Sequence, residues 1–123
     1  MDNSGNFWLA LDQLVAASEI VIDRPKGSAH PRYRDFIYPA DYGYLANTQA
    51  MDGGGLDVWV GSLPGRQLTG VICTVDLLKR DVELKLLLGC SADERRVILG
   101  LHNADSQSGM LVERPRGRAI KDE

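Results

Sequence analysis

The sequence Tyr38-Pro-Ala-Asp-Tyr-Gly-Tyr44 is followed, after a short gap, by Asp52-Gly-Gly-Gly-Leu-Asp57. Neither an amphipathic helix nor a plain strand needs three tyrosines, three aspartates and four glycines within twenty residues. The triple glycine lets the backbone turn sharply, so that Asp52 and Asp57 can bring their carboxylates to one point. Carboxylate oxygens are the ligands that Mg²⁺ prefers. The segment suggests a metal site, although a tyrosine-rich turn followed by a polar loop explains the same residues.

The composition is that of a soluble globular protein, with 123 residues, 44% of them hydrophobic and 25% charged. We expect one domain spanning 1–123, with flexible ends at 1–6 and about 115–123. A net charge of −3 disfavours a general polyanion binder, so a phosphate ligand would have to be held locally. The sequence shows no membrane-spanning run and no secretion signal, which predicts a cytoplasmic protein without a membrane partner. Cys73 and Cys90 lie in apolar segments and are expected to be free thiols.

Two helices are predicted, one near each end of the chain. The first follows a cap at Asn6 and runs from Phe7 to about Ala17. Its inner face is expected to contain Phe7, Leu11, Leu14 and Val15. The second opens at the capping box Ser91-Ala-Asp-Glu94 and runs to about His102. Its inner face is expected to contain Val97, Ile98 and Leu101.

Between the helices, short apolar or alternating segments predict about five strands. They cover 20–23, 57–60, 67–76, 82–88 and 110–113, with a further extended piece at 36–38. Residues 67–88 read as a hairpin with Asp76 and Asp81 at its shoulders. The pattern predicts the α+β class, mainly β, as a small closed or nearly closed five-stranded barrel with flanking helices. Closure could bring the hairpin beside the Asp52–Asp57 loop, and four converging carboxylates would repel one another unless cations were bound.

A cationic segment precedes the tyrosines. Its basic residues are Arg24, Lys26, Arg32 and Arg34. The planar guanidinium fork of arginine is well shaped for phosphate. The segment is therefore either a solvated loop or an arm that presents positive charge to a phosphate group.

From about Glu19 to Glu113 the chain resembles the soluble inorganic pyrophosphatase family. The resemblance rests on the segments Ile20–Asp23, Lys26–Ser28, Tyr38–Tyr44, Asp52–Val58 and Gly70–Val71, the last leading to Asp76 and Asp81. It implies a five-stranded barrel of the oligonucleotide/oligosaccharide-binding (OB) type with flanking helices. It also implies metal-activated hydrolysis of pyrophosphate.

The resemblance also implies roles for individual residues. The metal ligands would be Asp52, Asp57, Asp76, Asp81 and Asp23, the last in place of a family glutamate. Tyr38 and, approximately, Arg32 match substrate-binding positions of the family. Together with Lys26 and Arg34 of the cationic segment, they would bind the substrate. Tyr42 and Asp57 would be catalytic. The cofactor would be Mg²⁺, with Mn²⁺ as a second choice.

Several family positions are changed. Gly54 stands where the family has an aspartate that helps to activate the attacking water. Glu83 replaces a phosphate-binding lysine, and His102-Asn103 replaces a tyrosine–lysine pair. The β-hairpin that normally carries an arginine between Arg34 and Tyr38 is absent. The resemblance therefore implies a metal-binding face that is kept and a phosphate-binding face that is partly lost.

Three functions are compatible with these residues. The first is Mg²⁺-dependent hydrolysis of pyrophosphate or a related phosphoanhydride. The alternative is a metal- and phosphate-binding relative that has lost turnover. A nucleic-acid binder is the third, and the acidic balance disfavours it. We also expect a homo-oligomer, most simply a dimer, because Trp8, Trp59 and Met110 supply more large apolar groups than so small a barrel needs.

Overall fold

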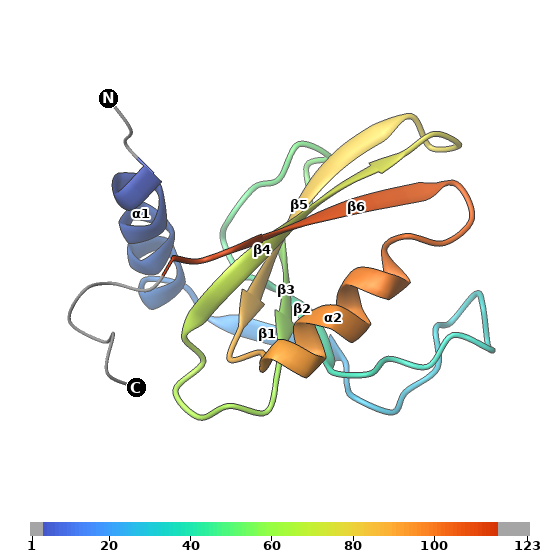
Figure 1. The fold of residues 1–123 in the computed structure, drawn as a ribbon, viewed down its shortest axis with the longest axis horizontal. Helices are drawn as coiled ribbons and strands as arrows, with labels where there is room; N and C mark the ends of the chain where they lie inside the picture. Colours follow the sequence, from blue (N-terminus) through green and yellow to red (C-terminus); the bar gives the residue numbers. More distant parts are fainter. Residues whose placement is uncertain (1–3, 116–123) are drawn as a thin grey trace.

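The computed structural model describes residues 4–115, which form two helices and six strands (Figure 1). In chain order these are α1 (Ser4–Ala16), β1 (Ile20–Arg24), β2 (Asp41–Leu45), β3 (Leu56–Val60), β4 (Leu68–Asp76), β5 (Asp81–Leu88), α2 (Ala92–Leu101) and β6 (Gln107–Glu113). The flexible ends expected at 1–6 and about 115–123 lie mostly outside the described residues. Helix α1, however, begins at Ser4, two residues before the predicted cap.

The six strands form one sheet in the order β1-β2-β3-β5-β4-β6. All neighbouring strands are antiparallel except β3 and β5, which run parallel. The α+β, mainly-β class and the β4–β5 hairpin are confirmed. The expectation of a closed five-stranded barrel needs correction, because within residues 4–115 the edge strands β1 and β6 form no ladder with each other. Strand β6 is longer than predicted and pairs with β4 from Gly70 to Asp76. The sixth strand is β2, which lies where no strand was predicted.

The second half of the tyrosine segment, from Asp41, is a strand and not a turn, because Gly43 lets β1 and β2 approach each other. A Cβ atom at position 43 would lie 1.8 Å from the carbonyl oxygen of Val21 on β1, so only glycine fits. Tyr42 and Tyr44, on either side, lie opposite Trp59 and Asp57 of β3. Because residues two apart in a strand share a face, both tyrosines point to the side of the sheet that carries Asp57.

The sheet is covered on both faces. One hydrophobic cluster joins Trp8 of α1 to alternate residues of β3 and β5, among them Val58 and Leu86. The second joins Ile98 of α2 to the residues between them, among them Trp59 and Leu87. Burial on both faces explains the continuous apolar run Leu86–Leu88, where a strand with one wet face would alternate.

The two helices differ in how well the sequence predicted their inner faces. In α1, Trp8 is 5% exposed and packs in the first cluster with Leu11 and Val15, whereas the predicted core residues Phe7 and Leu14 are exposed. Residues i, i+3 and i+7 share one side of a helix, and the helix turns its largest side chain inward.

In α2 the capping box is confirmed. The amide of Glu94 donates to Ser91 Oγ, and the amide of Ser91 donates to Glu94 Oε1. Ile98 is buried as expected, but Val97 is exposed.

The structure also bears on the expectations for the cysteines, the dimer and the membrane. Cys73 and Cys90 are free thiols, as predicted. Of the apolar groups that suggested an oligomer, Trp8 and Trp59 are buried within the chain and Met110 is exposed, so the dimer stays a prediction that rests on less apolar surface. In residues 4–115 no helix is long and apolar enough to cross a membrane.

Candidate functional site

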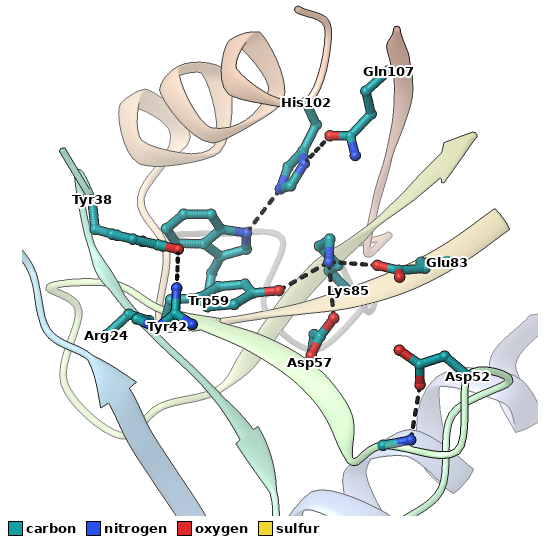
Figure 2. Close-up of polar contacts among 11 residues, drawn as sticks. Arg24, Tyr38, Tyr42, Asp52, Asp57, Trp59, Glu83, Lys85, His102 and Gln107 are labelled. Carbon is teal, nitrogen blue, oxygen red and sulfur yellow. Dashed lines mark hydrogen bonds and ion pairs between the residues drawn. The ribbon is translucent and has the colours of Figure 1, made fainter. Parts of the chain in front are cut away.

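The cationic segment from Arg24 to Arg34, called the cationic arm below, begins beside Tyr38. The arm folds back on itself, since the amide of Gly27 donates to the carbonyl oxygen of Tyr38 and the amide of Tyr38 donates to that of Ser28. Tyr38 is 5% exposed, and Arg24 Nη1 donates to its hydroxyl oxygen at 2.9 Å (Figure 2). The half-buried Arg24 is thereby held at the base of the arm.

The other predicted substrate-binding residues lie further along this arm. Lys26, Arg32 and Arg34 are all exposed. The amides of Arg32 and Tyr33 both donate to His30 Nδ1, which fixes the bend of the loop. The structure thus places Lys26, Arg32 and Arg34 on one exposed loop, which follows the half-buried Arg24 at the end of β1.

A lysine lies at the centre of the site. Lys85 of β5 is 5% exposed, and its Nζ donates three hydrogen bonds of 2.9 Å, to Tyr42 Oη, Asp57 Oδ2 and Glu83 Oε1. The parallel register places Asp57 of β3 opposite Lys85, and β2 brings Tyr42 to the same face. Figure 2 shows the ammonium group surrounded by these three oxygen atoms. Tyr42 and Asp57, the two residues predicted to be catalytic, are therefore close together, and both accept a hydrogen bond from Lys85.

The pKa values of this group follow from burial and charge. Burial alone would lower the pKa of Lys85, but Tyr42 and the Asp57 carboxylate raise it above the usual lysine value. Burial raises the pKa of the Tyr42 hydroxyl. At neutral pH Lys85 is therefore charged and Tyr42 keeps its proton, so Tyr42 is unsuited to be a general base.

A second polar chain extends from Trp59 to α2. The indole Nε1–H of Trp59 donates to His102 Nε2 at 3.1 Å, so the ring proton of His102 lies on Nδ1, which is 2.7 Å from Gln107 Oε1. Burial lowers the pKa of His102, which keeps the imidazole neutral at pH 7. The rings of Tyr38 and Tyr42 contact Trp59 on its other side. This aromatic group joins the arm to the Lys85 cluster.

Three of the predicted metal ligands line one cavity of about 660 Å³. They are Asp52, Asp57 and Asp81. The floor between the β2–β3 loop and the β4–β5 hairpin is apolar and includes Leu56 and Leu84. The hairpin therefore lies beside the loop, as expected, but hydrocarbon lines much of the space between the carboxylates.

The other two predicted ligands do not line this cavity. Asp76 is 8% exposed, and its Oδ1 accepts bonds from the amides of Leu78 and Lys79 and from Ser106 Oγ. The amide of Lys79 and the hydroxyl of Ser106 hold the pKa of Asp76 below its usual value. Asp23 is exposed, at an irregularity in the β1–β2 register. Asp76 therefore serves the turn that follows β4.

The expected convergence of four carboxylates is not formed. Within residues 4–115 no three side chains of His, Cys, Asp or Glu come close enough together to hold a metal ion. One oxygen of Asp52 accepts a hydrogen bond from the amide of Gly54 in its own loop, at 2.9 Å. One oxygen of Asp57 accepts a hydrogen bond from Lys85. The residues as they stand do not fit the Mg²⁺ or Mn²⁺ site that the resemblance implies, and the assignment of individual ligands remains a prediction.

Solved structures of bacterial inorganic pyrophosphatases have a similar fold. That of Coxiella burnetii is 16% identical, with a TM-score of 0.55, and the match covers 76% of this chain and 82% of that one. Those of Helicobacter pylori and Neisseria gonorrhoeae are 19% and 21% identical, with TM-scores of 0.54 and 0.52; they cover 80% and 72% of this chain, and 84% and 77% of theirs. The chain shares the fold of bacterial inorganic pyrophosphatases. No protein-family model and no curated protein sequence matches it.

The sequence did not single out Lys85 or Trp59 as site residues, and it marked His102 only as a changed family position. For Lys85 a signal exists, since it is the one charged residue in the run Leu84–Leu88. A lysine in a strand buried on both faces needs acidic partners. Trp59 and His102 lie 43 positions apart, and no local pattern links them.

Proposed function

We propose that this protein binds a phosphorylated small molecule through the cationic arm and does not hydrolyse it at an appreciable rate. The observation that carries the proposal is the Lys85 cluster. Its ammonium already neutralises Asp57, the carboxylate on which metal-activated hydrolysis would depend. Ligand binding needs only the arm, which remains exposed and positively charged.

The phosphate side of the proposal rests on Arg24. Its guanidinium is oriented by the Tyr38 hydroxyl and is half-buried, so water screens it less than the exposed cations of the loop. One of its terminal nitrogens is used by Tyr38, which leaves other N–H groups to donate to phosphate oxygens. Lys26 is two residues further along and exposed, where it can neutralise a second phosphate charge.

The loss of turnover rests on the other end of the site. Phosphoryl transfer requires neutralised oxygens and a positioned, activated water. Gly54 offers no side chain to accept the proton of that water, Tyr42 stays protonated, and Glu83 adds a negative charge where a phosphate would need a cation. Each of these changes opposes the reaction while leaving the arm intact.

The test is a calorimetric titration of the full chain with pyrophosphate, tripolyphosphate and a nucleoside diphosphate. Phosphate release is measured in parallel. We expect binding without Mg²⁺ and release no faster than in buffer. Arg24→Gln should weaken binding by about 10- to 100-fold, the usual range for a hydrogen bond to a charged group. Arg96→Gln removes an exposed arginine that pairs with Asp93 on α2 and should leave binding unchanged. Equal affinity of wild type and Arg24→Gln would contradict the proposal.

Mg²⁺-dependent hydrolysis of pyrophosphate or a related phosphoanhydride is the second candidate. It is favoured by the pyrophosphatase fold and by the single cavity that Asp52, Asp57 and Asp81 share. Release of phosphate with Mg²⁺ or Mn²⁺ that disappears in both Asp57→Asn and Asp81→Asn would establish it over the first.

Two further parts of the proposal concern the state of the protein in the cell. We infer a cytoplasmic homo-oligomer, most simply a dimer. Sedimentation that shows only monomer at micromolar concentration would contradict the dimer, and fractionation of cells would test the location.

A further inference from the structure

The Lys85 ammonium fills the space beside Asp57 in which a bound metal ion would lie. Its Nζ is 2.9 Å from Asp57 Oδ2 and 2.9 Å from Glu83 Oε1. A divalent ion would lie about 2.0–2.6 Å from the same carboxylate oxygen. On this side of Asp57 the ion and the ammonium would therefore overlap, and their positive charges would repel each other.

Lys85 is fixed in this position by its surroundings. An ammonium group has three N–H donors, and all three are used, by Tyr42, Asp57 and Glu83. Its Nζ also lies 5.4 Å from the centre of the Tyr42 ring. The side chain starts from the middle of β5 with 6% of its surface exposed, so moving it into water would break all three hydrogen bonds. A metal ion would have to displace a cation whose hydrogen bonds are all satisfied.

We propose that Lys85 is a built-in cation which replaces a divalent metal ion at Asp57, so that removal of its amine creates a metal site. A tethered cation is present at any metal concentration, and it offsets one of the two carboxylate charges in the folded chain. This inference does not rest on the proposed ligand binding, because metal binding is measured with no phosphate compound present.

In the experiment, the full chain is titrated with Mn²⁺, and bound Mn²⁺ is measured by electron paramagnetic resonance. Wild type and Asp57→Asn should give the same weak binding, with no site that depends on Asp57. Lys85→Ala opens space for an ion and should bind one Mn²⁺ per chain at least about tenfold more tightly than wild type. Asp57→Asn combined with Lys85→Ala should lose this gain. Lys79→Ala removes an exposed lysine of the β4–β5 turn and should behave as wild type.

Thermal unfolding gives a second reading of the same variants. Excess Mn²⁺ should raise the unfolding midpoint of Lys85→Ala by about 5 °C or more and leave that of wild type unchanged. If Lys85→Ala folds only with Mn²⁺ present, that result also supports the inference. If it folds under neither condition, Lys85→Gln is measured in its place, since glutamine keeps a donor for Asp57 without the charge, and the same gain is expected.

Two results would overturn the inference. One is micromolar Mn²⁺ binding to wild type that Asp57→Asn abolishes. The other is a folded Lys85→Ala or Lys85→Gln that binds Mn²⁺ no more tightly than wild type. Failure of the arm to bind phosphate compounds would leave both outcomes unaffected.

Discussion

Asp57 and Asp76 have the same side chain and the same predicted role, yet the fold uses them differently. Asp57 lies on β3 opposite a buried lysine, and its carboxylate forms an ion pair across the parallel strands. Asp76 ends β4, and its carboxylate accepts two backbone amides and a hydroxyl. An aspartate that matches a pyrophosphatase metal ligand in sequence is therefore free to bind a metal only if no other group of the chain already bonds to its oxygen atoms.

The largest expected effect comes from removing the cation at Asp57. Lys85→Met should destabilise the fold by about 2–4 kcal/mol, because two carboxylates lose their partner in a mostly buried site. The cost is set below that of a fully buried pair since Asp57 and Glu83 are 30% and 25% exposed. Urea unfolding measures the change. Lys85→Met with Asp57→Asn should recover part of it, and a loss below about 1 kcal/mol for Lys85→Met alone would mean that the cluster is not a stabilising unit.

The matching change at Asp76 should be smaller and purely structural. Asp76→Ala removes the acceptor for the amides of Leu78 and Lys79, and we expect a loss of about 1–2 kcal/mol in urea unfolding. Ser106→Ala removes only one of the three bonds and should cost less. Neither variant should alter Mn²⁺ binding or ligand binding. A clear effect of Asp76→Ala on Mn²⁺ binding would show that Asp76 is a metal ligand and not only a structural residue of the turn.

Acid should destabilise the fold through His102, a member of the aromatic group that joins the arm to the Lys85 cluster. Burial lowers the pKa of His102 in the folded state, so the unfolded chain binds a proton first as the pH falls. The contribution of the neutral His102 to the free energy of unfolding is fully present above the unfolded pKa of about 6.5. It is lost as the pH falls through the folded pKa.

Unfolding free energies measured from pH 8 down to pH 5 test this. The wild type should lose stability below about pH 6.5, and His102→Gln should show a flatter profile in that window. Asp76 titrates at lower pH, because its folded pKa is also depressed, so Asp76→Ala should leave this window unchanged. Identical slopes for wild type and His102→Gln would contradict the assignment of the neutral imidazole.

The smallest effect is expected at Gly54. In this loop Gly53 has a positive φ, at 88°, whereas Gly54 does not. A Cβ at position 54 would meet only the carboxylate of Asp52, with Oδ1 nearest at 3.4 Å. Gly54→Asp should therefore change stability by no more than about 0.5 kcal/mol. It should also leave phosphate release unchanged, since a new base cannot act without neutralised phosphate oxygens. A gain in kcat of about tenfold or more would instead favour the hydrolase candidate.

What the sequence determined is local or periodic. The capping box at Ser91 and Glu94 needs residues only three positions apart, and the β4–β5 hairpin needs only two adjacent strands and a turn. The resemblance to pyrophosphatases was carried by the tyrosine and aspartate segments, and the comparison with solved structures supports the fold. Strand β2, the open edges of the sheet and the rotation of α1 were missed, because all three depend on which distant surface each element meets.

What only the tertiary structure decided is the chemistry of the site. Asp57 and Lys85 are 28 positions apart and meet because β3 and β5 run parallel, with β4 inserted between them in the sequence. No pattern of residue types shows that Lys85 points to the Asp57 face with its three donors used. A one-residue change of register would turn Lys85 to the opposite face and leave Asp57 open. The sequence supplied the carboxylates, and the strand pairing decided that one of them would hold an ammonium group.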